Sequence, residues 1–171
     1  MVYQQVRPSF HLSTQCSRFI RRLNTQQYGM FGRLGHGGIQ DEFAPSLVEA
    51  LAGKKVVGAA AGANRTVVWT EAGELFTFGY GGVGRLGHGG EEKEDVPRLV
   101  EALAGKKAVG AAAGYDHTAV WTEAGQLFTF GFGAYGQLGH GGQETVHVPR
   151  LVVALGCMHQ QVPRLLGLTA P

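Results

Sequence analysis

Three histidines recur at one place in a glycine-rich motif and are the first candidates for metal binding. They are His36, His88 and His140, each in the wording LGHGG. A metal site needs ligands that converge on bonds of about 2 Å, whereas equivalent residues of stacked sheets lie about 10 Å apart. The pattern therefore favours a turn histidine with a local hydrogen bond, and we expect neither a metal nor a cofactor.

Two stretches, residues 79–84 and 131–136, satisfy the G-x-G-x-x-G pattern of dinucleotide-binding loops. Such a loop must lead directly into a helix, whose first amides then meet the pyrophosphate. Here the loops lead into RLGHGG or QLGHGG, which cannot begin a helix. Both stretches are therefore interpreted as turns.

Asp116 and His117 are adjacent and could in principle form a general-base pair. No serine or cysteine nucleophile stands beside them, and an earlier copy of the segment has Asn64 and Arg65 in their place. A base needs a proton to abstract within hydrogen-bond reach, so we interpret the pair as structural. The sequence predicts no catalytic residues and a protein that is not an enzyme.

These residues belong to a 52-residue unit that occurs in full at 33–84 and 85–136 and in part at 137–155. About 37 of its 52 positions are identical in the two full copies, which is typical of a repeat protein. Residues 28–155 form the repeat region. Residues 1–27 are a non-repeat leader, expected to be disordered or a short helix, and residues 156–171 are a non-repeat tail.

Each unit predicts short antiparallel strands and no long helix. In the first copy β-branched and aromatic residues favour strands at 65–70 and 75–78, joined by a hairpin with Gly73, and a small-residue strand at 55–61. A fourth strand is predicted at Pro45–Leu51 and Pro97–Leu103, with proline as its first residue. A one-turn helix is the alternative there. The fold class is all-β.

Residues 111–142, AAAGYDHTAVWTEAGQLFTFGFGAYGQLGHGG, resemble the regulator-of-chromosome-condensation repeat. The resemblance implies propeller blades, and therefore a partial β-propeller with two full four-stranded blades plus a fraction of a third. The RLGHGG wording is similar to repeats of large HECT-type ubiquitin ligases, without their HECT domain. Three features depart from the family. Arg65 replaces a histidine, and Trp69 and Trp121 replace smaller aliphatic residues. This sequence has two full repeats and a fraction, whereas the family closes a ring with about seven.

The resemblance implies a binding role. We expect a non-enzymatic protein-interaction module; the alternatives are nucleotide exchange or regulation of a small GTPase, or the substrate- or partner-binding part of a ubiquitin ligase. The family also includes the plant ultraviolet-B photoreceptor, which uses tryptophans, but Trp69 and Trp121 lie in predicted strands and favour packing.

The loops in which the copies diverge are the candidate partner surface, because loops on a rigid scaffold commonly carry recognition. Solvated connections without a role are the alternative. Unpaired blade edges also predict self-association. The candidate partner-binding residues are Asp41, Glu42, Asn64, Arg65, Glu92, Lys93, Glu94, Tyr115, Asp116, His117 and Glu144.

Charge and composition exclude several classes of protein. The net charge of +2 comes from an acid-free N-terminus with four arginines, while the repeat region holds the acidic residues and offers no basic stripe for nucleic acid. No apolar run reaches the ~20 residues that span a membrane. Cys16 and Cys157 have no metal-type or disulfide spacing. We expect a cytoplasmic or nuclear location, with a mitochondrial one as the alternative suggested by the arginine-rich N-terminus.

Overall fold

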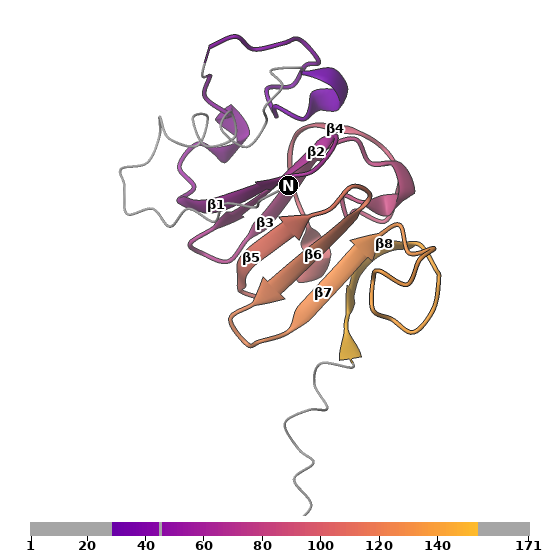
Figure 1. Cartoon of the computed structure of the whole chain (residues 1–171). Coiled ribbons are helices and arrows are strands. Elements are labelled where there is room, and N and C mark those ends of the chain that lie inside the picture. The colour runs from indigo at the N-terminus through magenta and orange to yellow at the C-terminus, as the bar shows by residue number, and fades with distance from the viewer. Residues whose placement is uncertain (1–28, 45, 154–171) are drawn as a thin grey trace, which may run out of the picture.

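Two four-stranded antiparallel sheets make up the computed structural model, which describes residues 29–44 and 46–153 (Figure 1). The predicted leader and tail lie outside the described residues. Sheet 1 has the order β1-β2-β3-β4 and sheet 2 the order β5-β6-β7-β8. The strands are β1 (Val56–Ala61), β2 (Arg65–Thr70), β3 (Leu75–Gly79), β4 (Glu94–Leu99), β5 (Ala108–Ala113), β6 (His117–Thr122), β7 (Leu127–Gly131) and β8 (Val146–Leu151).

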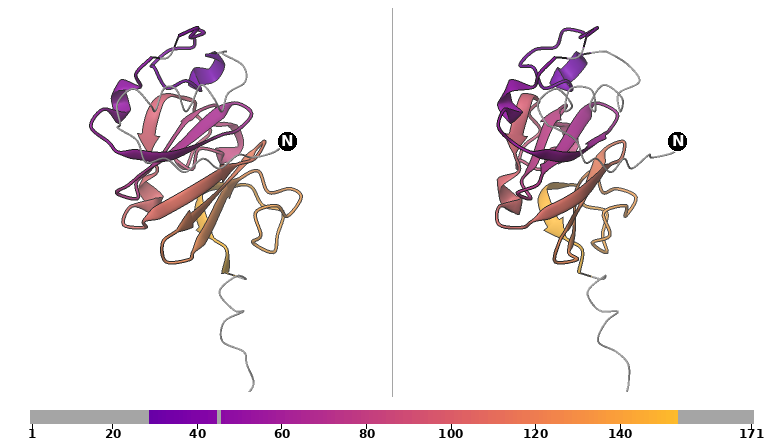
Figure 2. Two further views of the ribbon diagram at one scale, coloured as in Figure 1. Left: turned by 60° about the vertical axis from the view of Figure 1, so that its left-hand side comes forward. Right: turned by 90° about the vertical axis from the view of Figure 1, so that its left-hand side faces the viewer.

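The helical elements of the described residues are four 3-10 turns, and none of these residues forms an α-helix. They are η1 (Met30–Gly32), η2 (Glu49–Leu51), η3 (Gly82–Gly84) and η4 (Glu101–Leu103). The all-β prediction and the partial propeller are confirmed, since the sheets follow one another as fanned layers (Figure 2). Residues 29–44 and 46–51, which precede sheet 1, hold the turns η1 and η2 and no strand, and the predicted partial unit at 137–155 supplies β8 to sheet 2.

The first three strands of each sheet lie where the sequence predicts them. Val68 pairs with Ala59 and Phe76, so these side chains share one face of sheet 1. The hairpin glycine Gly73 has φ +82°, a left-handed conformation that glycine adopts without the steric cost of a Cβ atom. Gly125 repeats this geometry with φ +74°.

The predicted fourth strand is partly wrong. Pro97 lies inside β4 rather than at its first residue, and Pro97–Leu103 divides into the end of β4 and the turn η4. An outer edge strand tolerates proline because one side of its backbone has no partner. In the first copy Glu49–Leu51 is a 3-10 turn, which fits the one-turn alternative. The described chain holds no strand before β1 with which residues 46–51 could pair.

Two apolar clusters pack against the sheets, one on each face of sheet 1. The first lies between sheets and joins Val67 and Leu75 of sheet 1 to Val120, Phe128 and Phe130 of sheet 2, with Val100, Leu103 and three alanines. The second covers the other face of sheet 1, where Val48 and Leu51 pack on Ala59, Val68, Phe76 and Phe78. Fully burying a Val, Leu or Phe side chain contributes about 1.5–3 kcal/mol, so these clusters supply much of the driving force for stacking.

The tryptophans lie flat on their own sheets. A Cβ atom at Gly58 would lie 2.1 Å from the Trp69 ring, and one at Gly110 would lie 2.2 Å from the Trp121 ring. Only glycine therefore fits beneath each indole. Trp69 also packs against the cluster between the sheets, which assigns it a packing role.

The topology brings the divergent loops to one end of the sheets. In the order β1-β2-β3-β4, the β1–β2 and β3–β4 connections share one end, and the hairpin turns around Gly73 and Gly125 lie at the other. We call the first end the loop end. No helix among the described residues has the length and apolar content to cross a membrane.

Candidate protein-binding surface

Arg65 reaches from the start of β2 into the loop between β5 and β6, and its side chain is fully buried. Its Nε donates to Thr118 Oγ1 at 3.1 Å, and its Nη1 donates to the carbonyl of Tyr115 at 3.0 Å. Its Nη2 donates to the carbonyl of His117. The planar guanidinium has five donors in a fixed fork, which suits such a set of converging acceptors. Arg65 thereby joins sheet 1 to sheet 2.

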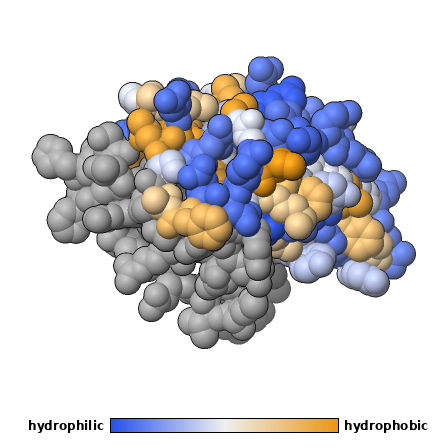
Figure 3. Space-filling model, turned by 90° about the horizontal axis from the view of Figure 1, so that it is seen from above, coloured by the Kyte–Doolittle hydropathy of each residue, from blue (hydrophilic) through white to orange (hydrophobic). Residues whose placement is uncertain are grey.

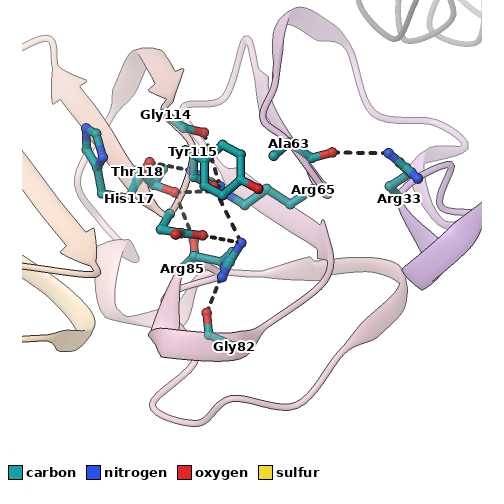
Figure 4. A network of polar contacts seen from close by, with 10 residues as sticks. Arg33, Ala63, Arg65, Gly82, Arg85, Gly114, Tyr115, His117 and Thr118 are labelled. Atoms are coloured by element: carbon teal, nitrogen blue, oxygen red, sulfur yellow. Dashed lines mark hydrogen bonds and ion pairs between the residues drawn. The ribbon is translucent and has the colours of Figure 1, made fainter. Parts of the chain in front are cut away.

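A second arginine, Arg85, holds the same loop from the β3–β4 connection (Figure 4). Its Nη1 pairs with Asp116 Oδ1 at 2.6 Å and lies 3.5 Å from the carbonyl of Tyr115. Its Nε donates to the carbonyl of Gly82 at 2.7 Å, and the Tyr80 ring lies 4.7 Å from its guanidinium carbon. Both arginines thus fix the backbone of Tyr115, whose side chain is 75% exposed.

Two of the three recurring histidines, His88 and His140, make the local hydrogen bond that the sequence predicts. The Thr77 hydroxyl donates to the carbonyl of Leu86 at 2.7 Å, and His88 Nε2 lies 2.9 Å from the hydroxyl oxygen of Thr77. Because the hydroxyl has a single proton, His88 Nε2 must be the donor. Thr129 and His140 repeat the arrangement at 3.0 Å. These residues fix the turn that leads out of each sheet.

Two histidines link stability to pH. Burial lowers the pKa of His88 below its ordinary 6.5, and the positive charge of Arg98 lowers it further. The pKa of His117 is lowered in the same way, first by burial and then by the positive charge of Arg65. Below pH 6.5 the unfolded chain therefore binds more protons than the folded chain. We expect the full stability above pH 6.5 and a loss as the pH falls below it. Urea unfolding at about pH 7.5 and pH 5.5 measures this difference.

The double variant His88→Gln/His117→Gln is the control for that titration. Its urea midpoint should depend less on pH than that of the parent chain, because two groups that favour the unfolded state in acid are gone. An equally steep loss in the variant, or a parent chain that is more stable at the acidic pH, would contradict the assignment to these two imidazoles.

The predicted partner residues occupy the loop end or the strand starts beside it. Most of the charged candidates already have a partner within the chain. Two of them accept hydrogen bonds: Asp41 from the amide of Gly29, and Glu42 from the hydroxyl of Ser46. Four form ion pairs: Glu94 with Arg98, Asp116 with Arg85, Lys93 with Asp95, and Glu144 with Arg150. The carbonyl of Asn64 accepts from the amide of Tyr80. Glu92 and Tyr115 are exposed, and His117 is half-buried.

One candidate needs correction. Arg65 is not available to a partner, because its side chain has no exposed surface and its donors point into the β5–β6 loop. Sequence reasoning also missed Arg85, the second side chain that holds this loop. The available signal was the arginine that begins RLGHGG in both full copies, whereas the third copy has Gln137.

Where described residues are seen from above, hydrophilic and apolar patches alternate (Figure 3). Of the described residues, no three His, Cys, Asp or Glu side chains group in a way that could hold a metal ion. The arrangement presents fixed loops with an exposed tyrosine, which is chemistry suited to recognition.

Comparison with known proteins decides the family. The model of the regulator of chromosome condensation (RCC1) repeat matches residues 28–69, 72–121 and 124–162. The chain belongs to the RCC1 repeat family. This RCC1-repeat chain is 39% identical over 136 residues to human E3 ubiquitin-protein ligase HERC2, covering 78% of the chain and 3% of that protein. It is 38% identical over 124 residues to the ultraviolet-B receptor UVR8 of Arabidopsis thaliana, covering 72% of the chain and 28% of the receptor.

Solved structures show the same fold. Human WBSCR16 matches with a TM-score of 0.62 and 26% identity, and Prp20p from Saccharomyces cerevisiae with a TM-score of 0.65 and 20% identity. Each match covers 72% of the RCC1-repeat chain and 32% of the solved chain. The chain thus spans about a third or less of these relatives, and it corresponds to their repeat part.

Proposed function

We propose that this RCC1-repeat chain is a non-enzymatic protein-binding module whose contact surface is the loop end around Tyr115. The observation that carries the proposal is that Arg65 and Arg85 both fix the Tyr115 backbone while its side chain remains 75% exposed. Tyrosine is enriched among residues that dominate binding energy. A loop fixed before binding loses little conformational entropy when a partner docks.

Comparing partners bound to variant chains tests the proposal. We expect Tyr115→Ala to reduce the recovery of specifically bound proteins by about tenfold, since a central interface tyrosine contributes at least ~1.4 kcal/mol. Recovery is measured by quantitative mass spectrometry after affinity purification from cell extract. Glu71→Ala, in the hairpin at the end opposite the loop end, is the matched control and should retain the same proteins.

Two outcomes would count against this surface. Equal recovery with the parent chain and Tyr115→Ala would remove the loop end as the site. Equal losses with Tyr115→Ala and Glu71→Ala would show an unspecific effect. Matching urea midpoints for the three proteins exclude unfolding as the cause of any loss.

The relatives supply two narrower partner classes. HERC2 is named as a ubiquitin ligase, which supports a ubiquitin-pathway partner, and the structure of Prp20p is described with its binding to Gsp1p and histones. For this chain we propose a partner in the ubiquitin pathway first and regulation of a small GTPase second, in the cytoplasm or nucleus. Release of a fluorescent guanine nucleotide from a panel of small GTPases separates them, because an unchanged rate with the chain present removes the second.

A further inference from the structure

Both full repeats hold an arginine at the loop end with the same backbone contacts. Arg33, which stands 52 residues before Arg85, donates from Nε to the carbonyl of Met30 at 3.2 Å and from Nη1 to the carbonyl of Ala63 at 3.1 Å. Arg85 meets the two corresponding carbonyls one repeat later (Figure 4). The hydroxyl of Thr66 donates to the carbonyl of Arg33 at 2.9 Å, and the bond to the carbonyl of Arg85 measures 2.8 Å.

The two sites differ in the residue that follows the carbonyl bound by Nη1. Asp116 places its carboxylate on Arg85 at 2.6 Å, whereas the first copy has Asn64 at that position. The backbone is alike in both, since the carbonyl of Asn64 accepts from the amide of Tyr80 at 2.8 Å and that of Asp116 from the amide of Phe132 at 2.9 Å. The first copy therefore keeps the arginine and lacks its carboxylate.

Arg33 is a buried cation without a counter-ion. It is 7% exposed. All 13 acidic residues of the chain lie within residues 41–144, in the described part, and none of them forms an ion pair with Arg33. Asp95 packs against the glycine that precedes Arg33, but its Oδ2 pairs with Lys93 at 2.7 Å. A cation removed from water without an opposite charge is costly, so this position favours an anion.

One nitrogen of Arg33 reaches the surface. Its Nε and Nη1 bind backbone carbonyls, and its Nη2 donates to no described residue. Among the described residues, Asp95 Oδ1 is the one buried side-chain nitrogen or oxygen atom without a hydrogen-bond partner, so Nη2 is in contact with solvent. In the second copy the side chain of Asp116 is 30% exposed where it meets Arg85. A carboxylate from another molecule can therefore approach Arg33 along the equivalent direction.

The Arg33 site adjoins the loop that carries Tyr115. Asn64 directly precedes Arg65, whose Nη1 lies 3.0 Å from the carbonyl of Tyr115 (Figure 4). Arg33 and Tyr115 thus lie on either side of one buried arginine at the loop end. A protein that docks on Tyr115 can reach Arg33 in the same contact.

The charges around Arg33 indicate how acidic its ligand can be. Asp41 binds the turn that also holds Arg33, because it accepts from the amide of Gly29, and Glu42 follows it in the chain. Together with Asp95 these carboxylates would repel a run of acidic residues. A single carboxylate flanked by uncharged residues avoids this repulsion. Its planar geometry matches the guanidinium group better than a spherical anion does.

We propose that Arg33 binds the carboxylate of one Asp or Glu side chain on the protein partner that docks at the loop end. The identity of the ligand as a partner's side chain rests on the proposed function, whereas the carboxylate site rests on Arg33 itself. The partner's carboxylate takes the place that Asp116 fills one repeat later. It forms a charge-assisted hydrogen bond with a cation that the fold has already taken from water.

Nuclear magnetic resonance of the full chain tests the site without a partner. The probe is the tripeptide acetyl-Gly-Glu-Gly-amide, and the control is its glutamine equivalent with sodium chloride at the same ionic strength. We expect the glutamate peptide alone to shift the Nε resonance of Arg33, with saturation at concentrations on the order of 10 mM. Asn64→Asp should abolish the shift by supplying an internal carboxylate. Asp116→Asn should make the Nε resonance of Arg85 respond to the same peptide.

Affinity purification from cell extract tests the partner's use of the site. We expect Asn64→Asp to reduce the recovery of specifically bound proteins by about tenfold. Gln126→Glu is the matched control, because it adds the same charge in the hairpin at the opposite end, where the first copy has Glu74. It should retain the bound proteins. Matching urea midpoints of both variants and the parent chain exclude unfolding as a cause.

The outcomes separate this site from the proposed function. An Arg33 resonance that does not move, moves equally with the glutamine peptide, or still moves in Asn64→Asp would overturn the site. Full recovery with Asn64→Asp, where Tyr115→Ala loses the bound proteins, would overturn the partner's carboxylate and leave the proposed function standing. A peptide shift at Arg33 together with full recovery in Tyr115→Ala would support the site and count against the proposed function.

Discussion

Replacing Arg65 by methionine is expected to lower the free energy of unfolding by about 3 kcal/mol. Methionine fills the space of the side chain stem but donates no hydrogen bond. The carbonyls of Tyr115 and His117 and the Thr118 hydroxyl then lose a charged donor in a buried place. Each buried group left without its partner costs about 1–3 kcal/mol. Urea unfolding measures the loss, and the midpoint temperature should fall by about 10 °C.

Arg98→Met is the control for that substitution. Arg98 is an exposed arginine of β4 that pairs with Glu94 at 2.6 Å, and exposed ion pairs contribute about 1 kcal/mol or less. We expect Arg98→Met to change stability far less than Arg65→Met. Equal effects of the two substitutions would show that Arg65 does not join the sheets in the way its contacts indicate.

Replacing Gly84 by alanine is expected to cost about 3 kcal/mol, the second largest effect. Gly84 has φ +69°, where an L residue costs about 1–2 kcal/mol. Its added Cβ would also lie 2.5 Å from the Cα of His147, and overpacking against backbone costs about 1–3 kcal/mol. The substitution should therefore separate the β3–β4 connection from sheet 2, and thermal unfolding reports the loss.

Gly136→Ala isolates the packing contribution. Gly136 is the equivalent residue one repeat later and has φ +72°, yet nothing lies within 4 Å of its added Cβ. It should cost only the backbone strain, about 1 kcal/mol. If Gly84→Ala and Gly136→Ala were equally damaging, the contact between the connection and His147 would have no energetic weight.

Local sequence predicts the strands well because strand-forming residues and turn glycines act over short distances. Arg65–Thr70 is β-branched and aromatic and forms β2, and Gly73 marks its hairpin. The fourth strand was harder to predict. Pro97 suggested the first residue of a strand, whereas it lies inside β4, an edge strand of sheet 1. The position that a proline can take in an edge strand depends on which backbone amides have no partner, and only the assembled sheet decides this.

The candidate surface was predicted only in outline, because its key contacts cross between repeats. Arg65 differs from its equivalent His117, and this divergence suggested an exposed recognition residue. The structure instead buries Arg65 against a loop about 50 residues away in the chain. Divergence between repeats can therefore reflect which neighbour a blade faces, and sequence spacing alone does not reveal that neighbour.

Each sheet takes its fourth strand from the repeat that follows, since β4 begins at Glu94, beyond the first unit, and β8 lies in the partial third. The unit that was duplicated in the sequence is consequently not the unit that forms one sheet. Cutting the chain at a repeat boundary, after Gly136, would strip β8 from sheet 2 and leave β7 as a bare edge. Each 52-residue period therefore completes the sheet before it and leaves its own sheet without a fourth strand until the next period follows.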